Sequence, residues 1–580
     1  MAVDFSNLKS DISNISKTIR FVYESDKRLC YVRLVLIAVQ SILPLASLYL
    51  LKKLIDTVTH ANINNPEGFT EVSVTIAIVS AVFLLIQVST AINNYVGEIL
   101  GQRIIDFINT MLHNKSLELD LTYYDNAEYH DTFHRAQQEA NFRPIQILSN
   151  ISDLIKNFIS FVGTAIILAS LSWWILIIMI LAGIPSLIIR MRKSRIYYAW
   201  KKANTSLYRR VNYFSMLMTH RTYAKEVRIF NLGKYLQNTH NSIRGKLMDQ
   251  IIVLLRTQMR GNVLSAVVEI GALTASIVIL TNKFYTGSVS IGGYVMFFAA
   301  VRSANTFLNG VVSNVNGIYN NKLFLSNLFE FIDLKPQIRV PENPIPMPVL
   351  KDGIRFENVS FHYEGSSKMV LNNLSFHIKP GETVLITGKN GAGKTTLINI
   401  LTRMYECTSG AVTFDNINIK DIDPETMHKN IGIIFQDYSK YDMTVTENIK
   451  FGNVFEDHDP TKVAEISGAS VFVKDLPLQY NTLIGKYFQD GEELSIGQWQ
   501  KIALARALYN SQSQIVILDE PTASIDLETE NHFFENLRET VKDKIVIIIG
   551  HKITGKIKAD SYYNLQKGTL IKVDKDYSKA

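Results

Sequence analysis

Long apolar runs alternate with polar segments over roughly the first 320 positions of the chain. A membrane-spanning helix needs about 20 mostly apolar residues. The runs 34–51, 72–92, 261–280 and 291–315 are each close to this length. A further uncharged stretch, 157–189, is too long for one crossing. The pattern therefore predicts more than four membrane helices in the first half of the chain.

The uncharged stretch contains Trp173 and Trp174 near its middle. Tryptophan favours the membrane–water interface, so we expect two helices joined there by a tight turn. The first of the two is predicted to begin near Ile145. Together with the other runs this gives six spans, which place both ends of the chain on the same side of the membrane.

Lysine and arginine are concentrated on one side of these predicted spans. Segment 190–260 is dense in both residues, whereas segment 57–71 contains neither. Loops rich in Lys and Arg stay in the cytoplasm, so 190–260 is predicted to be cytoplasmic and 57–71 external. Both termini are then cytoplasmic, and we expect a multi-pass protein of the cell membrane.

The predicted inner loops, roughly 93–144 and 190–260, keep the periodicity of helices. We therefore expect the membrane helices to continue well past the bilayer. Each pair is predicted to end in a short crossing helix, near 123–133 and 223–233, placed to contact the cytoplasmic part of the chain.

Three polar residues interrupt the last two spans: Glu269, Arg302 and Asn305. An ionisable residue within a membrane usually faces a cavity or a partner. Two interpretations remain open at this point. The residues line a polar path for a substrate, or Glu269 and Arg302 form an ion pair that only packs helices together.

The pattern changes after position 330. Five prolines in 331–352 prevent a helix from continuing, which is typical of a linker. Beyond it, short alternating runs predict an α/β domain. We therefore expect an all-α membrane domain with six helices at 1–330, a linker at 331–352 and an α/β domain of the P-loop NTPase type at 353–580.

A phosphate-binding loop follows the apolar strand "TVLIT" and precedes a predicted helix, which is the context that the motif GxxxxGK[ST] requires. Its glycines let backbone N–H groups turn toward phosphates, and the helix N-terminus adds a partial positive charge. Lys394 is expected to reach the β- and γ-phosphates of ATP, and Thr395 to bind Mg²⁺. The predicted loop consists of Gly388, Lys389, Asn390, Gly391, Ala392, Gly393, Lys394, Thr395 and Thr396.

The segment "QIVILDEPTAS" (514–524) supplies two acids at the end of a second apolar strand. Asp519 is placed to bind the metal. Glu520 follows it and is expected to polarise the water that attacks the γ-phosphate. The chain is thus predicted to be an ATP hydrolase with ATP and Mg²⁺ as its cofactors.

A second anion-binding motif, "LSIGQ" (494–498), opens another predicted helix with Ser495 at its N-cap. The P-loop already holds one nucleotide and anchors a different helix. If LSIGQ cannot fold back onto its own P-loop, its phosphate belongs to a second molecule. This predicts that ATP is bound between two copies of the chain.

These motifs resemble those of an ATP-binding cassette (ABC) exporter that fuses one membrane domain to one nucleotide-binding domain. The resemblance is specific over 355–572 and weaker over 20–330. It implies a stacking role on adenine for Tyr363 and contacts with Mg²⁺ for Gln436. The motif LSIGQ departs from the family's usual pattern at Ile496, where glycine is common. We expect ATP hydrolysis to survive this difference.

The resemblance also implies roles around the γ-phosphate. Ser495, Gly497 and Gln498 would act on the nucleotide of the second subunit. Asp526 would link the two sites, and His551 would contact the γ-phosphate.

Charge and composition argue against nucleic-acid binding, a cysteine-based site and a signal peptide. The net charge of +7 is modest for 580 residues, so we do not expect nucleic-acid binding. The two cysteines, Cys30 and Cys407, fall in different halves and indicate no disulfide or metal site. The first 20 residues are polar and mixed in charge, unlike a signal peptide.

The predicted function is ATP-driven export by a dimer of half-transporters, most simply a homodimer, in a lipid bilayer. The segment "GQWQKIALARAL" resembles a subgroup often tied to export of small peptides. We therefore expect a peptide or an amphipathic small molecule as the substrate. A lipid or multidrug exporter and an ATP-gated regulator or channel remain the alternatives.

Overall fold

The computed structural model describes residues 17, 19–60, 66–125, 133, 137, 142–521, 527–550 and 558–573. The chain forms two compact units. The first, called the membrane unit below, comprises Met1–Glu118 and Ala127–Leu334. The second, called the cassette unit, comprises Leu119–Asn126 and Lys335–Ala580.

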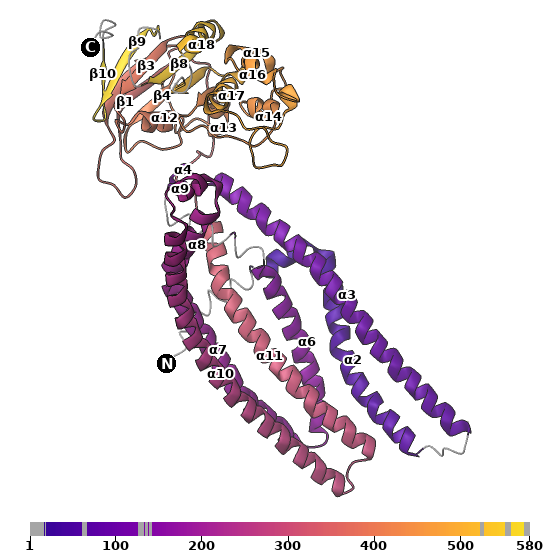
Figure 1. The fold of residues 1–580 in the computed structure, drawn as a ribbon. Coiled ribbons are helices and arrows are strands. Elements are labelled where there is room, and N and C mark those ends of the chain that lie inside the picture. The colour runs from indigo at the N-terminus through magenta and orange to yellow at the C-terminus, as the bar shows by residue number, and fades with distance from the viewer. Residues whose placement is uncertain are drawn as a thin grey trace. The chain divides into compact units, whose positions relative to one another are not determined.

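The described residues of the membrane unit form helices and the turns that connect them (Figure 1). Its elements are α2 (Lys27–His60), α3 (Pro66–Glu118), α6 (Arg143–Ala169), α7 (Trp173–Ala203), α8 (Thr205–Thr219), η1 (Arg221–Tyr223), α9 (Ala224–Ile229), α10 (Gly233–Tyr285) and α11 (Ile291–Ile332). Helix α2 packs beside α3, α6 beside α11, and α7 beside α10.

Six of the described helices are long and apolar enough to cross a membrane, as the sequence predicted. The turn between α6 and α7 ends at Trp173, where the paired tryptophans stack with ring centroids 4.2 Å apart. Helices α3 and α10 each have 53 residues. At 1.5 Å per residue this is about 80 Å, far more than a bilayer of about 30 Å. The predicted extension of the helices beyond the membrane is confirmed.

Most of the apolar surface of these helices is not covered by the chain itself. In the most apolar windows of α3 and α10, 17% of the residues are buried. Leu84 of α3 and Val267 of α10 are among the exposed ones. A soluble protein rarely leaves such continuous apolar surface open. Lipid or a second subunit must therefore cover it.

The cassette unit contains two sheets (Figure 1). A four-stranded sheet has the order β2-β1-β4-β5, and a six-stranded sheet has the order β10-β9-β3-β8-β7-β6. The strands are β1 (Ile354–Phe361), β2 (Leu371–Ile378), β3 (Thr383–Gly388), β4 (Ser409–Phe414), β5 (Ile417–Asn418), β6 (Ile431–Ile434), β7 (Ile515–Asp519), β8 (Ile545–Gly550), β9 (Ser561–Gln566) and β10 (Thr569–Lys572).

The helices of this unit cover and connect the sheets. They are α4 (Leu121–Tyr124), α12 (Lys394–Leu401), α13 (Pro424–Lys429), α14 (Val445–Lys450), α15 (Thr461–Ile466), α16 (Ser470–Val473), η2 (Gln479–Asn481), α17 (Ile496–Tyr509) and α18 (Leu527–Thr540). In the six-stranded sheet β3, β8, β7 and β6 run parallel, as does β9 beside β3. Their carboxyl ends share one edge, where ligands of open α/β sheets bind.

A short segment from between α3 and α6 packs with the cassette unit. The carboxylate of Asp120 accepts a hydrogen bond from the backbone N–H of Ile338 at 3.0 Å and another from Gln337. The hydroxyl of Tyr123 donates to the carbonyl of Lys335 at 2.8 Å, and Tyr405 donates to Asp125. Much of the crossing helix predicted near 123–133 lies outside the described residues; α4 covers its start, and η1 with α9 covers most of 223–233.

The carboxylate of Asp415 organises the entry into the first strand of the cassette unit. It accepts hydrogen bonds from the backbone N–H groups of Lys351, Asp352 and Gly353, at 2.6–2.8 Å. Burial alone would raise the pKa of Asp415, but these three N–H groups and the charge of Lys351 lower it below its ordinary value.

We expect the substitution D415A to lower the free energy of unfolding of the cassette unit by about 2 kcal/mol, because three N–H groups lose a charged acceptor. Since the pKa of Asp415 is lower in the folded state, this stabilisation is present at neutral pH and disappears as the pH falls below about 4. Thermal unfolding of the full chain at pH 7 and at about pH 2 measures both effects. Equal unfolding temperatures for D415A and wild type at pH 7 would contradict this account.

Candidate functional site

The P-loop lies where the sequence predicted it, between β3 and α12. Gly391 and Gly393 have φ of +75° and +106°, which side chains rarely adopt. A Cβ on Gly388 would lie 2.6 Å from the carbonyl oxygen of Leu565. Glycine is therefore required at all three positions for the loop to turn its N–H groups toward a phosphate at the N-terminus of α12.

The side chain of Lys394 is buried and folds back onto the loop. Its Nζ donates a hydrogen bond to the carbonyl of Gly388 at 2.8 Å. It also lies 3.8 Å from Oε1 of Glu520. The ammonium group of Lys394 thus has a carbonyl and a carboxylate beside it. When a nucleotide binds, the group can exchange these acceptors for phosphate oxygens.

Asp519 ends β7 and is 2% exposed. Its Oδ2 has neither solvent contact nor a hydrogen-bond partner among the described residues. Burial raises the pKa of Asp519 to about 6, the neighbouring charge of Glu520 adds to the rise, and Lys394 opposes it. A buried carboxylate oxygen without a partner is costly, and a bound cation would offset that cost.

Glu520 is held from two sides. The side chain of Gln436 donates from Nε2 to Oε2 of Glu520 at 3.0 Å, and the side chain of Gln500 donates to the Glu520 carbonyl at 3.2 Å. The backbone of Glu520 has φ of +50°, a conformation unusual for a residue with a side chain. The carboxylate is thus oriented beside Lys394 and Gln436 rather than left to rotate freely.

The oxygen donors near this edge fit a magnesium ion. Mg²⁺ prefers oxygen ligands and is usually bound by one or two carboxylates together with phosphates and water. The unpartnered Oδ2 of Asp519 and the exposed Thr395 are donors of this kind. Among the described residues no group of three His, Cys, Asp or Glu side chains could hold a metal by itself. Asp519 and Thr395 therefore suit a metal ion whose remaining ligands come from the phosphates of a nucleotide and from water.

Tyr363 follows β1 and lies next to the P-loop helix. Its hydroxyl is 2.8 Å from Oγ1 of Thr396, and its ring meets that of Tyr405 edge to face, 5.5 Å between centroids. Tyr405 itself donates a hydrogen bond to Asp125. Sequence reasoning placed Tyr363 at the adenine but missed Tyr405, because contacts between distant segments leave no local pattern in the sequence.

Ser495 caps α17 as predicted. Its Oγ accepts a hydrogen bond from the N–H of Gln498 at 3.2 Å, and the Gln498 side chain accepts one from the N–H of Ser495 at 2.8 Å. This is a capping box, which the spacing S-x-x-Q could have revealed. Ile496 is 63% exposed, and Gly497 lies in the first turn of α17. The described hydrogen bonds of the Ser495 and Gln498 side chains thus stay within this first turn.

Two predicted residues, Asp526 and His551, lie outside the described residues. Gly550, the residue before His551, ends β8. Since β8 lies between β3 and β7, Gly550 is at the same sheet edge as the P-loop and Asp519.

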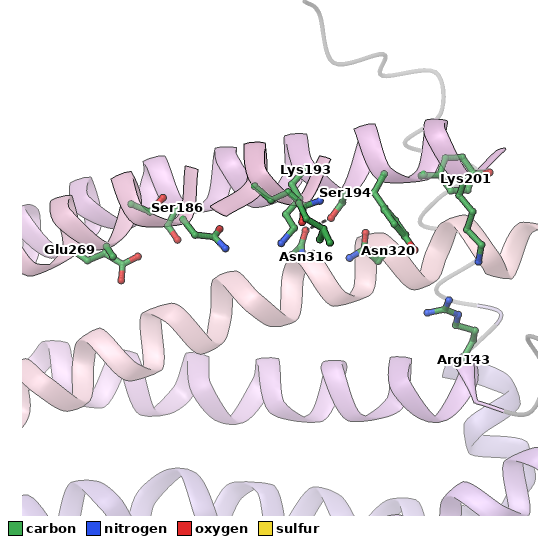
Figure 2. Close-up of a pocket in the computed structure, with 15 residues that line it drawn as sticks. Arg143, Ser186, Lys193, Ser194, Lys201, Glu269, Asn316 and Asn320 are labelled. Carbon is green, nitrogen blue, oxygen red and sulfur yellow. Dashed lines mark hydrogen bonds between the residues drawn. The ribbon is translucent and has the colours of Figure 1, made fainter. Parts of the chain in front are cut away.

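The membrane unit contains a cavity of about 860 Å³ between α7, α10 and α11 (Figure 2). Glu269 lies at one end of this cavity, and Lys201 and Arg143 lie at the other. Between them Ser194 donates a hydrogen bond to Asn316 at 2.8 Å. Polar side chains thus line part of the cavity, with Glu269 at one end and Lys201 and Arg143 at the other.

Glu269 is the one residue of the three predicted for the substrate path that lines this cavity. Asn309 donates to its Oε2 at 3.0 Å, and Asn305 lies 3.5 Å from the same amide. Arg302 is exposed, two helical turns from Asn309, and lies outside the lining. No ion pair joins Glu269 to Arg302 within the part of the chain that the structure describes.

A P-loop at the edge of a parallel sheet, with Asp519 and Glu520 beside it, defines a nucleotide-binding domain of the P-loop class, here joined to six helices of membrane-spanning length. Residues 371–523 match the family model described as ABC transporter. The chain is therefore an ABC transporter ATP-binding domain fused to a membrane domain. Such a domain implies ATP hydrolysis coupled to transport.

Relatives of similar length match almost the whole chain. The subtilin transport ATP-binding protein SpaT of Bacillus subtilis is 29% identical over 97% of this chain and 91% of its own. The nisin transport ATP-binding protein NisT of Lactococcus lactis subsp. lactis is 27% identical over 96% and 92%. The structure of a bacterial Atm1-family ABC exporter with ATP bound matches with a TM-score of 0.79 at 20% identity, covering 94% of both chains. The fold is thus that of an ABC exporter.

Proposed function

We propose that this chain is one half of an ATP-driven peptide exporter and that two copies form the working transporter. The observation that carries the proposal is the fusion, in one chain, of a complete set of P-loop residues with a polar cavity among membrane-length helices. The similarity to the subtilin and nisin transport ATP-binding proteins supports the class of cargo.

ATP hydrolysis would use the residues around Glu520. The P-loop N–H groups and Lys394 bind the β- and γ-phosphates, and Tyr363 stacks on the adenine. Bound Mg²⁺, held by Asp519, Thr395 and Gln436, would neutralise phosphate charge. Glu520 would accept a proton from the attacking water. The water oxygen bonds to the γ-phosphorus while the bond between the γ-phosphorus and the β–γ bridging oxygen breaks, which yields ADP and phosphate. Gln436 holds the Glu520 carboxylate in place for this step.

The second copy would complete each ATP site. The capped N-terminus of α17 presents N–H groups to an anion, and its exposed Ile496 faces away from its own core. Ser495, Gly497 and Gln498 of one copy would then meet the nucleotide held by the P-loop of the other. Asp526 would link the two sites, and His551 would contact the γ-phosphate. The uncovered apolar helix surface supports a dimer within the bilayer.

The cassette unit would face the cytoplasm, in the cytoplasmic membrane. Lys193 and Lys201 at one end of α7 and Arg256 and Arg260 on α10 belong to the basic segment 190–260, which stays inside by the positive-inside rule. The end of the cavity at Lys201 then lies toward the side from which cargo and ATP arrive.

The cavity fits a charged, flexible cargo better than an apolar one. Its acid at one end and its bases at the other can pair with the amino and carboxylate groups of a peptide. Glu269 has an asparagine partner but no cation among the described residues, so an ammonium group of the cargo would find it available.

We expect the substitution E269Q to raise the peptide concentration for half-maximal stimulation of ATP hydrolysis about tenfold, because a charged hydrogen bond to the cargo is lost. Turnover without peptide should not change, since Glu269 belongs to the membrane unit and the nucleotide-binding residues belong to the cassette unit. The matched control is D249N, an exposed acid on the same helix. Identical stimulation curves for E269Q, D249N and wild type would contradict the assignment.

Export itself is tested with purified protein in sealed liposomes. The cassette units that face outward receive ATP and a labelled peptide, and the proposal requires uptake against a gradient. Uptake of an apolar dye instead of peptide would favour a multidrug exporter. ATP-dependent passage that only dissipates a gradient would identify a gated channel and overturn the proposal.

A further inference from the structure

A second cavity of the membrane unit, of about 480 Å³, lies between α2, α3 and α6. Polar and charged side chains line much of it, although it lies among membrane-length helices. The members used below are Arg33, Asn93, Gly97, Glu98, Asp153 and Lys156. The cavity described above, which contains Glu269, shares none of these residues.

Arg33 is the charged residue buried most deeply in this second cavity, with 9% of its surface exposed. Within the part of the chain that the structure describes, its guanidinium makes no hydrogen bond and no ion pair. Its Nε is shielded from solvent and has no partner, and the same is true of Oδ1 of Asn93. Leaving a buried charge without a partner costs several kcal/mol in proteins generally, so this arrangement indicates that a ligand completes it.

The other charges in the cavity compensate Arg33 only in part, through an electrostatic attraction to Asp153 without a direct contact. Lys156 and Asp153 form an ion pair with each other at 2.8 Å. Glu98 is exposed. The buried charge that lacks a directly bonded partner is therefore that of Arg33, and its planar fork of N–H groups suits the oxygens of a phosphate or carboxylate.

Gly97 of α3 makes room for this guanidinium. A Cβ at position 97 would lie 2.9 Å from Nη1 of Arg33. Any residue other than glycine would therefore displace the arginine from its place beside α3. The guanidinium thus lies against α3 at Gly97 rather than extended into solvent.

The position of the cavity along the membrane helices indicates which anion Arg33 binds. Arg33 directly precedes the apolar run 34–51, and Asn93 directly follows the run 72–92. Both therefore lie where hydrocarbon gives way to headgroups, on the side of the long helical extensions. Basic pockets between membrane helices at this level bind lipid headgroups.

We propose that Arg33 anchors the phosphate of a phospholipid headgroup in this cavity. The lipid is a bound component of the transporter and not its cargo, so this site goes beyond the export function. Lys156 and Asp153, already paired, would border the rest of the headgroup, and the acyl chains would lie against the apolar faces of α2 and α3.

The test measures lipid binding to the purified full chain by native mass spectrometry in detergent. Three probes are compared: phosphatidylglycerol, diacylglycerol with the same chains, and glycerol 3-phosphate. We expect phosphatidylglycerol to bind wild type and diacylglycerol not to bind. The substitution R33Q should raise the dissociation constant of phosphatidylglycerol tenfold to a hundredfold, roughly the value of a charged hydrogen bond, and R33K should restore part of it.

The variant G97A keeps the positive charge of Arg33. It should also weaken phosphatidylglycerol binding, because the new methyl group displaces the guanidinium. Alanine is a better helix former than glycine, so α3 should still form. The controls are R256Q, an exposed arginine of α10, and G271A, where a Cβ meets nothing within 4 Å. Both should bind lipid as wild type does.

Three results would overturn the proposal. If R33Q bound phosphatidylglycerol with wild-type affinity, Arg33 would not be the residue that binds the headgroup. Equal affinity for glycerol 3-phosphate and phosphatidylglycerol would make the ligand a free phosphate compound rather than a lipid. Displacement of phosphatidylglycerol by a transported peptide, lost in R33Q, would make the cavity a second cargo site.

Discussion

The substitution E520Q should lower ATP turnover roughly a hundredfold or more, since the side chain loses its ability to accept a proton from the attacking water. ATP should still bind, because the P-loop glycines and Lys394 are unchanged. The amide of the new glutamine keeps an oxygen for the hydrogen bond from Gln436. Turnover by the purified protein and retention of labelled ATP in the same sample measure the two effects separately.

The matched control is E535Q, an exposed acid on α18. It should hydrolyse ATP as wild type does. If E520Q kept wild-type turnover, Glu520 would not be the base. If E520Q lost ATP binding together with turnover, its main role would be structural, through the unusual backbone conformation at this position.

Mixed dimers test whether each ATP site takes residues from both copies. One variant is K394A, which removes the ammonium group of the P-loop. The other is G497D, which sets a negative charge in the first turn of α17, where a carboxylate suits the helix but repels phosphate. Each variant alone, as a homodimer, should lose ATP turnover roughly a hundredfold.

The two arrangements of these variants have opposite outcomes if the sites are shared. With K394A in one copy and G497D in the other, both changes fall in the same site and the second site remains complete. With both changes in one copy, each site carries one of them and neither is complete. Dimers purified through two different affinity tags allow the comparison. The reverse result, with turnover kept only when both changes lie in one copy, would show that each chain builds its own site and would overturn the shared-site proposal.

The sequence predicted local structure well wherever a motif is contiguous. The P-loop lies between a strand and a helix as expected, because its glycines, Lys394 and the flanking apolar runs act over fewer than 20 residues. The turn before Trp173 was predicted for the same reason: interface preference is a property of the residues themselves.

Partners that lie far apart in sequence could not be predicted. Asn309 as the partner of Glu269, and Asp125 as the partner of Tyr405, depend on how distant helices and loops pack. Arg302 looked as suitable as Glu269 for the cavity because both interrupt apolar runs. Its position two turns along α11 from Asn309, about 10 Å at 1.5 Å per residue, places it outside the lining.

The segment Leu119–Asn126, which belongs to the cassette unit, limits how the protein can be divided into separate fragments. The chain passes between its two units at three points, near 118, 126 and 334, and not only through the proline-rich connection. A soluble fragment that starts at 335 would lack Asp120 and Asp125, so two backbone N–H groups and the hydroxyl of Tyr405 would lose their acceptors. Catalytic constants obtained from such a fragment would describe an incompletely assembled enzyme.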